Sequence, residues 1–400
     1  MCSPRRSWVA ALFGVLTLTG TAAGTERTAI PLPEVIVDPN EGTTVGVLPV
    51  LLIANDDKSI RSIIAPDVRY NDTTGVYPTY RFYDFPTAKQ KYFLIAGKGE
   101  RRGEYFEATY VGQDLYDGWL DLRGSIVREE DPFERFFGYG NDTPSSNETN
   151  YASMTNAATL FGGINLGANL QPSVQARLRQ VRIGRGGVSN LPQIKTSASF
   201  SGLDGVGGAT VVGTRFGLTY DTRDISDIPT EGVFVDGGME VIDKALGSSS
   251  SHLKYGLDAK AYLPLRTDKK YVVALRGGAD YLQNGDDAPF FEKNRVGGVH
   301  SLRGFGSSRF TDDNRVILQG ELRSNVYERE IFGVNAHLEV APFVDLAKVF
   351  HHASEFPLEQ LHPVGGVGFR AVVVPQVVAY VDVGTSGGSP SAFTGIDYPF

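Results

Sequence analysis

Apolar and charged residues alternate along several segments of this chain, and this alternation limits the possible folds more than any other feature of the sequence. In the segment 271–281 the odd positions are mostly apolar, whereas the even positions include an arginine and an aspartate. The segments 211–223 and 253–263 repeat the pattern, with charged residues on the parity opposite the apolar ones. Because successive side chains of a β-strand point to opposite faces, these segments predict strands with one apolar and one charged face.

The N-terminus has the features of an export signal. Arg5 and Arg6 precede an apolar run from Trp8 to Leu18, and small residues follow as far as Gly24. This order predicts a secretory signal peptide over residues 1–24, which is removed from the mature protein. A twin-arginine signal is the alternative interpretation of the arginine pair, but a barrel has to be exported unfolded.

Removal of this segment limits the chemistry of the mature chain. It takes two of the 38 basic residues and none of the 46 acidic ones, so the balance becomes 36 minus 46, or −10. Such a charge argues against a protein that binds nucleic acid. Cys2 is the only cysteine and lies in the removed segment, so disulfides and thiolate catalysis are excluded.

The length of the chain distinguishes a soluble β-sandwich from an outer-membrane β-barrel, two folds whose strands both alternate apolar and polar residues. Beyond the signal peptide, no apolar run approaches the roughly 18 residues that a transmembrane helix needs. A soluble sandwich and an outer-membrane barrel both contain strands with one apolar face. We count about sixteen candidate strands between Thr43 and Phe400, which is typical of a barrel with spans of about 10 residues.

We therefore predict an all-β protein, a transmembrane antiparallel β-barrel over residues 43–400 in the bacterial outer membrane, in contact with membrane lipid. A short periplasmic segment over residues 25–42 precedes it. The aromatic C-terminus supports this prediction, because Tyr398 and Phe400 share one parity and we expect them on a lipid-facing strand. The charged residues that we predict to line the lumen are Arg215, Asp221, Arg276 and Asp280.

A glycine-rich loop lies between two of the predicted strands, and it places a single arginine, Arg303, among four glycines. Loops are usually mobile and polar, and an arginine in a shielded position needs a carboxylate. Acidic residues follow on the next two strands. This combination predicts a segment held inside a hollow structure, and the alternative is a solvated surface-loop arginine.

The loop and three further patterns resemble one known family. The residues Leu302, Arg303, Gly304 and Phe305 resemble the Val-Arg-Gly-Phe/Tyr loop motif of the BamA/TamA-type outer-membrane assembly family, also called bacterial surface antigen barrels. The segment 220–232 is similar to the family's Asp-Thr-Arg-Asp and Pro-x-x-Gly hairpin. The segments 319–323 and 343–345 are similar to its Glu-Leu-Arg and Phe-x-Asp strands, and all four patterns occur in the family's order.

The resemblance implies a sixteen-stranded barrel in which the arginine loop folds into the lumen and docks on acidic strands near the closing seam. The partners that it implies for Arg303 are Glu321 and Asp345, and parity independently puts each of them on a polar strand face. Glycines give the backbone the conformational freedom that such a loop requires. The glycines that we predict as hinges are Gly297, Gly298 and Gly306.

Three features depart from the family pattern. Leu302 replaces the usual valine, and Ala347 stands where the acidic strand is expected to have a glycine, which weakens the predicted packing of the loop. Only residues 25–42 precede the first predicted strand. We therefore expect a barrel without the periplasmic POTRA domains of the family, so a POTRA-bearing partner is one of the partners that we consider.

Enzymatic and metal chemistry have weak support in the sequence. The residues His351, His352, His362, Glu355 and Glu359 lie near one connection, but their spacing is irregular, and we predict a solvated loop instead of a metal site. A hydrolase embedded in a barrel needs a Ser/His pair on the outer face, and we locate none among the predicted strands. We expect no catalytic residue, no cofactor and no metal.

The leading functional hypothesis is a non-enzymatic barrel that assists the assembly or insertion of outer-membrane proteins. A weak seam between a first strand near Val45–Ile53 and a last strand near 393–400 would offer a template edge to an inserting strand. The predicted seam residues are Phe393, Gly395 and Phe400. One alternative is a passive or ligand-gated pore plugged by the Arg303 loop, and another is a receptor barrel whose long loops bind an external partner.

Overall fold

The computed structural model describes residues 18–22, 25–55, 60–331, 334–355, 358–373, 377–396, 398 and 400. Residues 1–17 of the predicted signal peptide lie outside this part of the chain, and residues 18–22 form a strand. The strands of the main sheet are β1 (Leu18–Ala22), β2 (Thr25–Asp38), β3 (Gly42–Ala54), β4 (Ile60–Ile64), β5 (Asp67–Asn71), β6 (Gly75–Thr87), β7 (Gln90–Lys98), β8 (Glu104–Asp114), β9 (Leu120–Phe136), β10 (Thr149–Ile164), β11 (Leu170–Arg185), β12 (Ala209–Asp221), β13 (Gly232–Ile242), β14 (His252–Pro264), β15 (Tyr271–Gln283), β18 (Asn314–Ile331), β19 (Val334–Phe350), β20 (His362–Val373), β21 (Val377–Thr385) and β22 (Ser391–Ile396).

The remaining elements are short and lie in the connections. They are the helix α1 (Leu115–Gly118), the 3-10 helices η1 (Ser145–Asn147), η2 (Ile194–Thr196), η3 (Lys244–Leu246), η4 (Gly285–Asp287), η5 (Phe290–Glu292) and η6 (Ala353–Glu355), and the strands β16 (Asn294–Val296) and β17 (Phe310–Asp312). In the described part of the chain, no helix has the length and apolar character needed to cross a bilayer.

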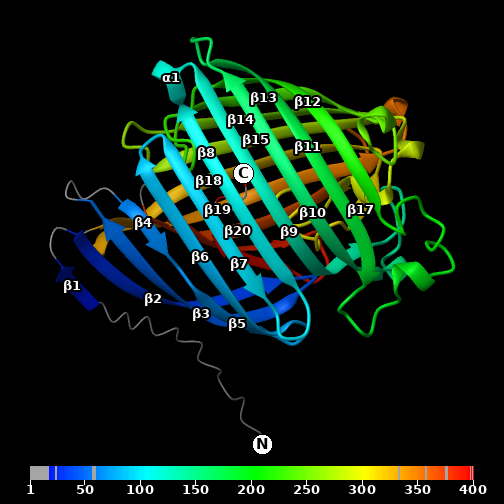
Figure 1. Cartoon of the computed structure of the whole chain (residues 1–400), viewed down its shortest axis with the longest axis horizontal. Coiled ribbons are helices and arrows are strands. Elements are labelled where there is room, and N and C mark those ends of the chain that lie inside the picture. The colour runs from blue at the N-terminus through cyan, green and yellow to red at the C-terminus, as the bar shows by residue number, and fades with distance from the viewer. Residues whose placement is uncertain are drawn as a thin grey trace, which may run out of the picture.

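The main sheet is an up-and-down antiparallel barrel, and its strands wrap around a common interior (Figure 1). From β2 to β22, neighbours in the sequence are neighbours in the sheet, except that β4 and β5 both pair with β3 and β6 and so share one strand position. β2 and β22 are brought together through Thr394 of β22, which is hydrogen-bonded to the backbone of β2. The predicted all-β barrel is confirmed.

The strand count and the start of the barrel differ from the prediction. The described residues form a sheet of 20 strands. Because β1 lies in the predicted signal peptide and β4 and β5 share one position, the strands from β2 to β22 occupy 20 minus 2, or 18, positions in the wall, where about sixteen were predicted. The segment 25–42 was expected to precede the barrel, but β2 pairs with β3 along twelve residue pairs from Arg27–Ile53 to Asp38–Gly42. Prolines at 31 and 33 obscured its strand pattern in the sequence. The strand tolerates them because its outer edge pairs with β1 only over residues 25–29 and carries no backbone ladder beyond them.

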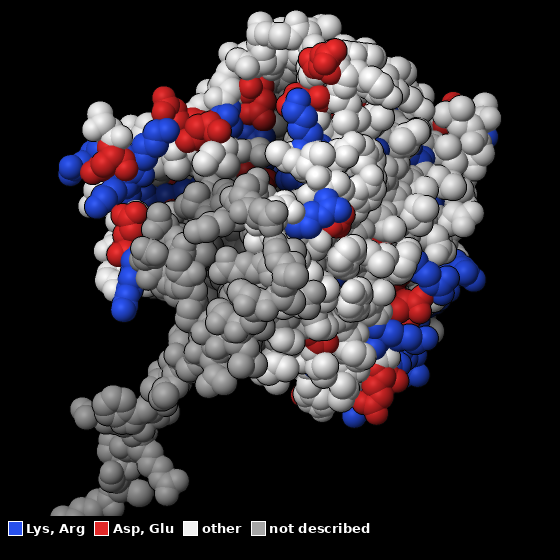
Figure 2. All heavy atoms as spheres, turned by 60° about the vertical axis from the view of Figure 1, so that its left-hand side comes forward, with Lys and Arg blue, Asp and Glu red and all other residues white. Residues whose placement is uncertain are grey.

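The two faces of the barrel wall differ in polarity as the alternation predicts. Large apolar side chains such as Ile126, Leu160 and Leu257 are more than half exposed on the outer face. On the face shown in Figure 2, charged side chains lie mainly along two margins of the described surface, and uncharged residues cover most of the area between them. An apolar band between charged rims is what a lipid bilayer requires of a barrel.

The C-terminal residues do not lie on the lipid face, which corrects the prediction for Tyr398 and Phe400. Tyr398 donates a hydrogen bond to Glu339 at 3.0 Å, and its ring lies 3.8 Å from the guanidinium carbon of Arg323. The Phe400 ring is buried against Tyr262 of β14 and residues of β15. These contacts turn the C-terminal residues toward the inside of the barrel. The alternation of apolar residues in so short a segment does not show which side of the wall they face.

Candidate functional site

The loop between β15 and β18 enters the barrel and forms the candidate site. Gly297 and Gly298 begin its turn with φ values of 123° and 83°, a region that favours glycine. Behind them, the Leu302 and Phe305 backbones close a tight turn, because Leu302 donates to Gly298 O at 3.0 Å and Gly298 donates to Phe305 O at 2.9 Å. The turn presents Arg303 to the barrel wall.

Arg303 is fully buried and makes a two-point contact with Asp345 of β19. Its Nε and Nη2 atoms lie 2.9 and 2.8 Å from the two carboxylate oxygens of Asp345, and its backbone N–H donates to the same carboxylate at 3.1 Å. Its Nη1 atom donates to Glu321 of β18 at 3.0 Å. The structure therefore brings Arg303 together with both predicted partners.

A third carboxylate and two further arginines complete the site. Arg303 Nη1 also donates to Asp382 of β21 at 2.9 Å. Glu321 accepts hydrogen bonds from Arg323 at 2.8 Å and from Arg370 of β20 at 2.9 and 3.1 Å. The side chains of Arg303, Glu321, Asp345, Asp382 and Arg370 have no exposed surface, and Arg323 is 3% exposed.

The charges in this cluster are equal in number. Three arginines face three carboxylates, so the buried network has no net charge, and its hydrogen bonds offset part of the desolvation cost. Burial lowers the pKa of Arg303, but the hydrogen bonds and charge of Asp345, with the nearby Glu321 and Asp382, raise the pKa above its ordinary value. Arg303 therefore stays positively charged and holds the loop to the three strands β18, β19 and β21.

Apolar packing holds the loop on the same strands. The Phe343 ring centroid lies 3.5 Å from the guanidinium carbon of Arg303. Leu302 is fully buried in a cluster with Phe343, Ala347 and Val364. Ala347 was expected to weaken this packing, but its methyl group is itself buried in the cluster.

Two glycines of the loop lie too close to other atoms for a side chain. A Cβ on Gly304 would lie 2.7 Å from Val364, and one on Gly306 would lie 2.2 Å from the Asn40 amide oxygen. Ser391 of β22 also donates to Gly304 O at 3.0 Å. The loop therefore contacts the last strand of the barrel as well as the acidic strands.

The loop has a second electrostatic anchor, Glu292, which the sequence did not reveal. Glu292 is 2% exposed and accepts hydrogen bonds from Lys254 at 2.7 Å, from Arg177 at 3.1 and 3.2 Å and from Arg179 at 3.1 Å. Burial raises its pKa, but the charges of Lys254 and Arg177 hold the pKa well below its ordinary value. The loop is thus held at two places: basic residues of the wall bind the carboxylate of Glu292, and acidic residues of the wall bind the guanidinium of Arg303.

The four predicted lumen-lining residues do not form one cluster. Arg215 pairs with Asp236, and Asp221 pairs with Arg223 at 2.7 Å near a strand end. Arg276 donates to Asp258 at 2.6 Å and to the carbonyl of His300 in the loop at 2.8 Å. Asp280 accepts from Arg315 at 2.6 Å, and Arg315 donates to the loop carbonyl of Arg295 at 2.9 Å. Arg276 and Asp280 therefore support the loop, whereas Arg215 and Asp221 belong to separate ion pairs.

The seam lies between β2 and β22, not between β22 and the predicted strand at 45–53. Thr394 accepts a hydrogen bond from Val37 N at 3.0 Å and donates to Val35 O at 3.0 Å, so one side chain replaces a backbone ladder. Between the described parts of β2 and β22, no ladder of paired residues is present. By contrast, β2 and β3 pair over the full length of β2 beyond Arg27.

The predicted seam residues have different positions. Phe393 lies beside the seam in β22 and is buried opposite Asp382 in the register with β21. Gly395 also lies in β22, where a Cβ would approach the Tyr380 hydroxyl to 2.6 Å. Phe400 is remote from the seam, because its ring packs on β14 and β15.

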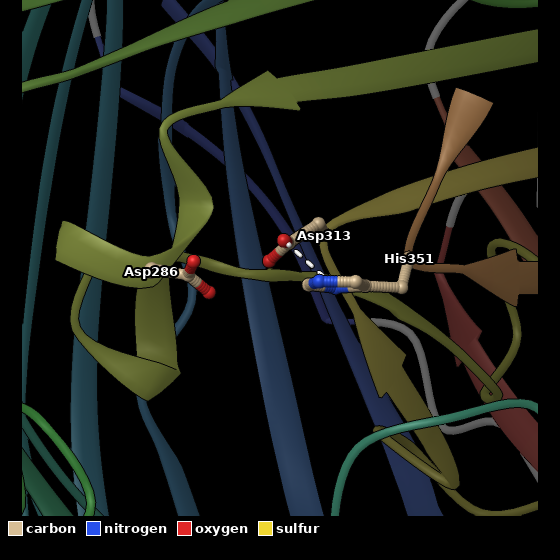
Figure 3. A group of neighbouring side chains, drawn as sticks. All are labelled: Asp286, Asp313 and His351. Atoms are coloured by element: carbon tan, nitrogen blue, oxygen red, sulfur yellow. Dashed lines mark ion pairs between the residues drawn. The ribbon is translucent and has the colours of Figure 1, made fainter.

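Of the histidines considered as metal ligands, His351 alone approaches three aspartates of the loop in the described residues, of which Asp312 lies 3.3 Å from its Nδ1 atom. Its Nδ1 atom lies 3.1 Å from Asp313, and Asp286 offers an oxygen within 4.8 Å of both (Figure 3). Asp313 is already paired with Lys293, whereas His362 stacks on Phe310 with ring centroids 4.0 Å apart. The cluster is an ion-pair group at the base of the loop, in which Lys293 supplies the positive charge.

Comparison with known proteins identifies the family. A family model for the Omp85 superfamily domain matches residues 90–370, which is more than half of the chain. The chain belongs to the Omp85 superfamily. The match confirms the predicted family resemblance, and this Omp85 protein is a barrel of the bacterial outer membrane, as predicted.

Individual relatives match with lower similarity. The outer membrane protein assembly factor BamA of Nitratidesulfovibrio vulgaris is 27% identical over 154 residues, which are 37% of this chain and 19% of that protein. The crystal structure of BamA from Haemophilus ducreyi lacking POTRA domains 1-3 has a TM-score of 0.55 at 14% identity, covering 96% of this chain and 75% of that one. CdiB from Acinetobacter baumannii has a TM-score of 0.47 at 13% identity, covering 94% and 59%. The likeness to the BamA structure shows a shared fold.

Proposed function

We propose that this Omp85 protein assists the insertion or assembly of outer-membrane proteins without catalysing a chemical reaction. The observation that carries the proposal is the seam between β2 and β22, which the Thr394 hydroxyl holds in place of a backbone ladder. In hydrocarbon, the backbone N–H and C=O groups of an inserting strand need hydrogen-bond partners. A strand edge whose own backbone groups are not paired with a neighbouring strand is therefore a favourable template. BamA of N. vulgaris is an assembly factor by name, and the proposal extends that role to this chain.

The arginine loop has a structural part in this mechanism. Arg303 joins β18, β19 and β21, and Ser391 ties the loop backbone to β22. Opening of the seam would move β22 relative to β2, while the network keeps the strands before β22 in register. The proposal therefore assigns Arg303, Glu321, Asp345 and Asp382 to holding one side of the seam rigid.

Membrane lipid and unfolded outer-membrane proteins are the partners that this mechanism requires, and a POTRA-bearing protein is a candidate for delivering the clients. Insertion of an unfolded test barrel into liposomes tests the proposal. Liposomes that contain this protein should fold the test barrel several times faster than empty liposomes. Equal rates across lipid compositions would contradict the proposal.

A pore is the second candidate function, and the two opposite anchors of the loop favour it. Glu292 and Arg303 hold the loop to different parts of the inner wall, as a plug would be held. In planar bilayers a plugged pore should conduct little until residues 297–306 are deleted, and then conduct in stable steps. Loss of existing steps on that deletion would contradict the plug.

A further inference from the structure

The outer wall of the barrel contains an apolar groove that the proposed function does not use. It has a volume of about 880 Å³ and extends over β6 to β12, and Leu246 of η3 also lines it. Small outward-facing residues lie opposite large ones across the strands. Ala158 is paired with Ile126 and Leu178, and Ala176 is paired with Leu160.

The large residues stand on the lipid side of the wall. Ile126 is 60% exposed and Leu160 is 63% exposed. Since the small residues between them leave a depression in an otherwise apolar surface, the groove has the shape and polarity to hold hydrocarbon chains. An outer-membrane barrel exposes this face to acyl chains, so the charges near the groove decide which lipid fits best.

Arginines gather at one rim above this groove. Arg182 and Arg185 lie at the end of β11, and Arg101 and Arg102 lie in the turn between β7 and β8. Arg102 donates to the carbonyl of Arg185 at 2.8 Å, which brings the turn and the end of β11 together. In the described part of the chain, no carboxylate lies within ion-pair distance of these four arginines.

Acidic residues occur on the same rim but do not balance the arginines. Glu104 is held by Arg128 and, at 3.8 Å, by Lys98. Glu100 accepts from the backbone of Val76 at 3.4 Å. The basic residues of the rim are Lys98, Arg101, Arg102, Arg128, Arg182 and Arg185, and the acidic ones are Asp72, Glu100, Glu104 and Glu130. The rim is therefore net positive beside an apolar groove.

The spacing fits a membrane lipid. Arg182 lies four residues from Leu178 and six from Ala176 along β11, which is about 13 to 20 Å at the rise of a β-strand. One leaflet of a bilayer is about half of the roughly 30 Å hydrocarbon core. A headgroup at Arg182 would thus place its acyl chains across the groove.

We propose that this face binds an anionic lipid, with a phosphate headgroup on Arg182, Arg185, Arg101 and Arg102 and several acyl chains in the groove. Arginine suits this role because its planar guanidinium donates to two phosphate oxygens at once. The groove lies on β6 to β12, away from the seam strands β2 and β22. Binding here is independent of the proposed insertion activity.

Native mass spectrometry of the full chain tests the proposal with two named lipids. The probes are a six-chain glucosamine disaccharide lipid with two phosphates, and phosphatidylethanolamine, which has no net charge. The wild-type protein should retain the phosphorylated lipid at least about tenfold more strongly. Replacing Arg182 and Arg185 by glutamine should reduce retention about fivefold per arginine, the effect of one basic residue near an anionic membrane surface.

A groove-filling variant and two controls separate the parts of this site. Ala158→Phe fills the groove and should weaken retention several-fold. Ala279→Phe fills a smaller groove of about 250 Å³ that is lined mostly by β14 and β15, with Arg315 of β18 and Phe350 of β19. Arg266→Gln removes an exposed turn arginine, and both variants should leave retention unchanged. A folded wild-type protein that retains both lipids equally, or an Ala158→Phe or arginine variant that behaves like these controls, would overturn the proposal.

Discussion

The Nη1 atom of Arg303 lies 2.9 Å from Oδ2 of Asp382, and this contact ties the lumen loop to β21. Because β21 is the strand that pairs with β22, the buried network reaches within one strand of the seam. The loop motif and the seam are therefore parts of one structure, and a change in the network should alter the stability of the wall beside the seam.

Replacing Arg303 by alanine should cost about 3–5 kcal/mol in the free energy of unfolding, because it leaves three buried carboxylates facing two arginines. Urea unfolding of the folded barrel in detergent measures this change. Arg266→Ala, an exposed arginine paired with Asp268, is the matched control and should change the free energy by less than about 1 kcal/mol. Equal effects of the two variants would contradict the buried network.

Asp345 and Asp382, two acidic partners of Arg303, should contribute unequally to the free energy of unfolding. Asp345 accepts two side-chain hydrogen bonds and one backbone hydrogen bond from Arg303, whereas Asp382 accepts one short bond from Arg303 and longer ones from Arg370 at 3.4 and 3.5 Å. Asp345→Asn should therefore destabilise the barrel more than Asp382→Asn, by about 1 kcal/mol or more. The same unfolding measurement decides the order, and a reversed order would show that Asp345 is not the main anchor.

A glycine pair on β20 and β21 tests how closely the loop approaches the wall. A Cβ on Gly384 would lie 2.6 Å from the carbonyl oxygen of Arg303, whereas one on Gly365 would meet nothing within 4 Å. Gly384→Ala should lower the free energy of unfolding by about 1–3 kcal/mol, since backbone atoms have to shift. Gly365→Ala is the control and should be tolerated, so a harmless Gly384→Ala would argue against the docked loop.

Acidification should release the other anchor of the loop. The pKa of Glu292 is held below its ordinary value, so its stabilisation is complete above the pKa of the unfolded chain, roughly 4.3, and is lost as the pH falls through the lower pKa of the folded state. Conductance in planar bilayers should therefore stay low between pH 7 and roughly 4.3 and rise only as the pH falls further.

Glu292→Gln should show raised conductance already at pH 7, and Asp286→Asn, an exposed change in the same loop, should behave like the wild type. A Glu292→Gln variant with wild-type conductance at every pH would exclude this anchor as a holder of the loop.

The lumen-facing part of the site was accessible to sequence reasoning because charge alternates on long strands. Glu321 and Asp345 could be placed on polar faces from parity alone, and the glycine-rich loop marked Arg303. Asp382 and Arg370 could not be found in this way, since each is a single charge in a short apolar strand and nothing local connects it to the loop.

Other features depend on contacts between distant segments. Glu292 lies in a connection without periodicity, and its role comes from basic residues on β11 and β14. Tyr398 and Phe400 turn inward because Arg323 and Glu339 lie inside the wall. β2 was missed because Pro31 and Pro33 interrupt its pattern, although β3 pairs with it throughout.

The most direct test of the account is a disulfide across the seam, made by Val35→Cys and Thr394→Cys in a Cys2→Ser background. Val35 and Thr394 are already joined by a hydrogen bond, and Val35→Cys with Val45→Cys is the matched control, because these two residues are opposite each other in the fully paired β2 and β3. With the seam disulfide oxidised, insertion of a test barrel into liposomes should fall to the rate of empty liposomes and recover on reduction, while the control pair remains active in both states. Full activity of the oxidised seam pair would contradict the claim that β2 and β22 separate to template an inserting strand.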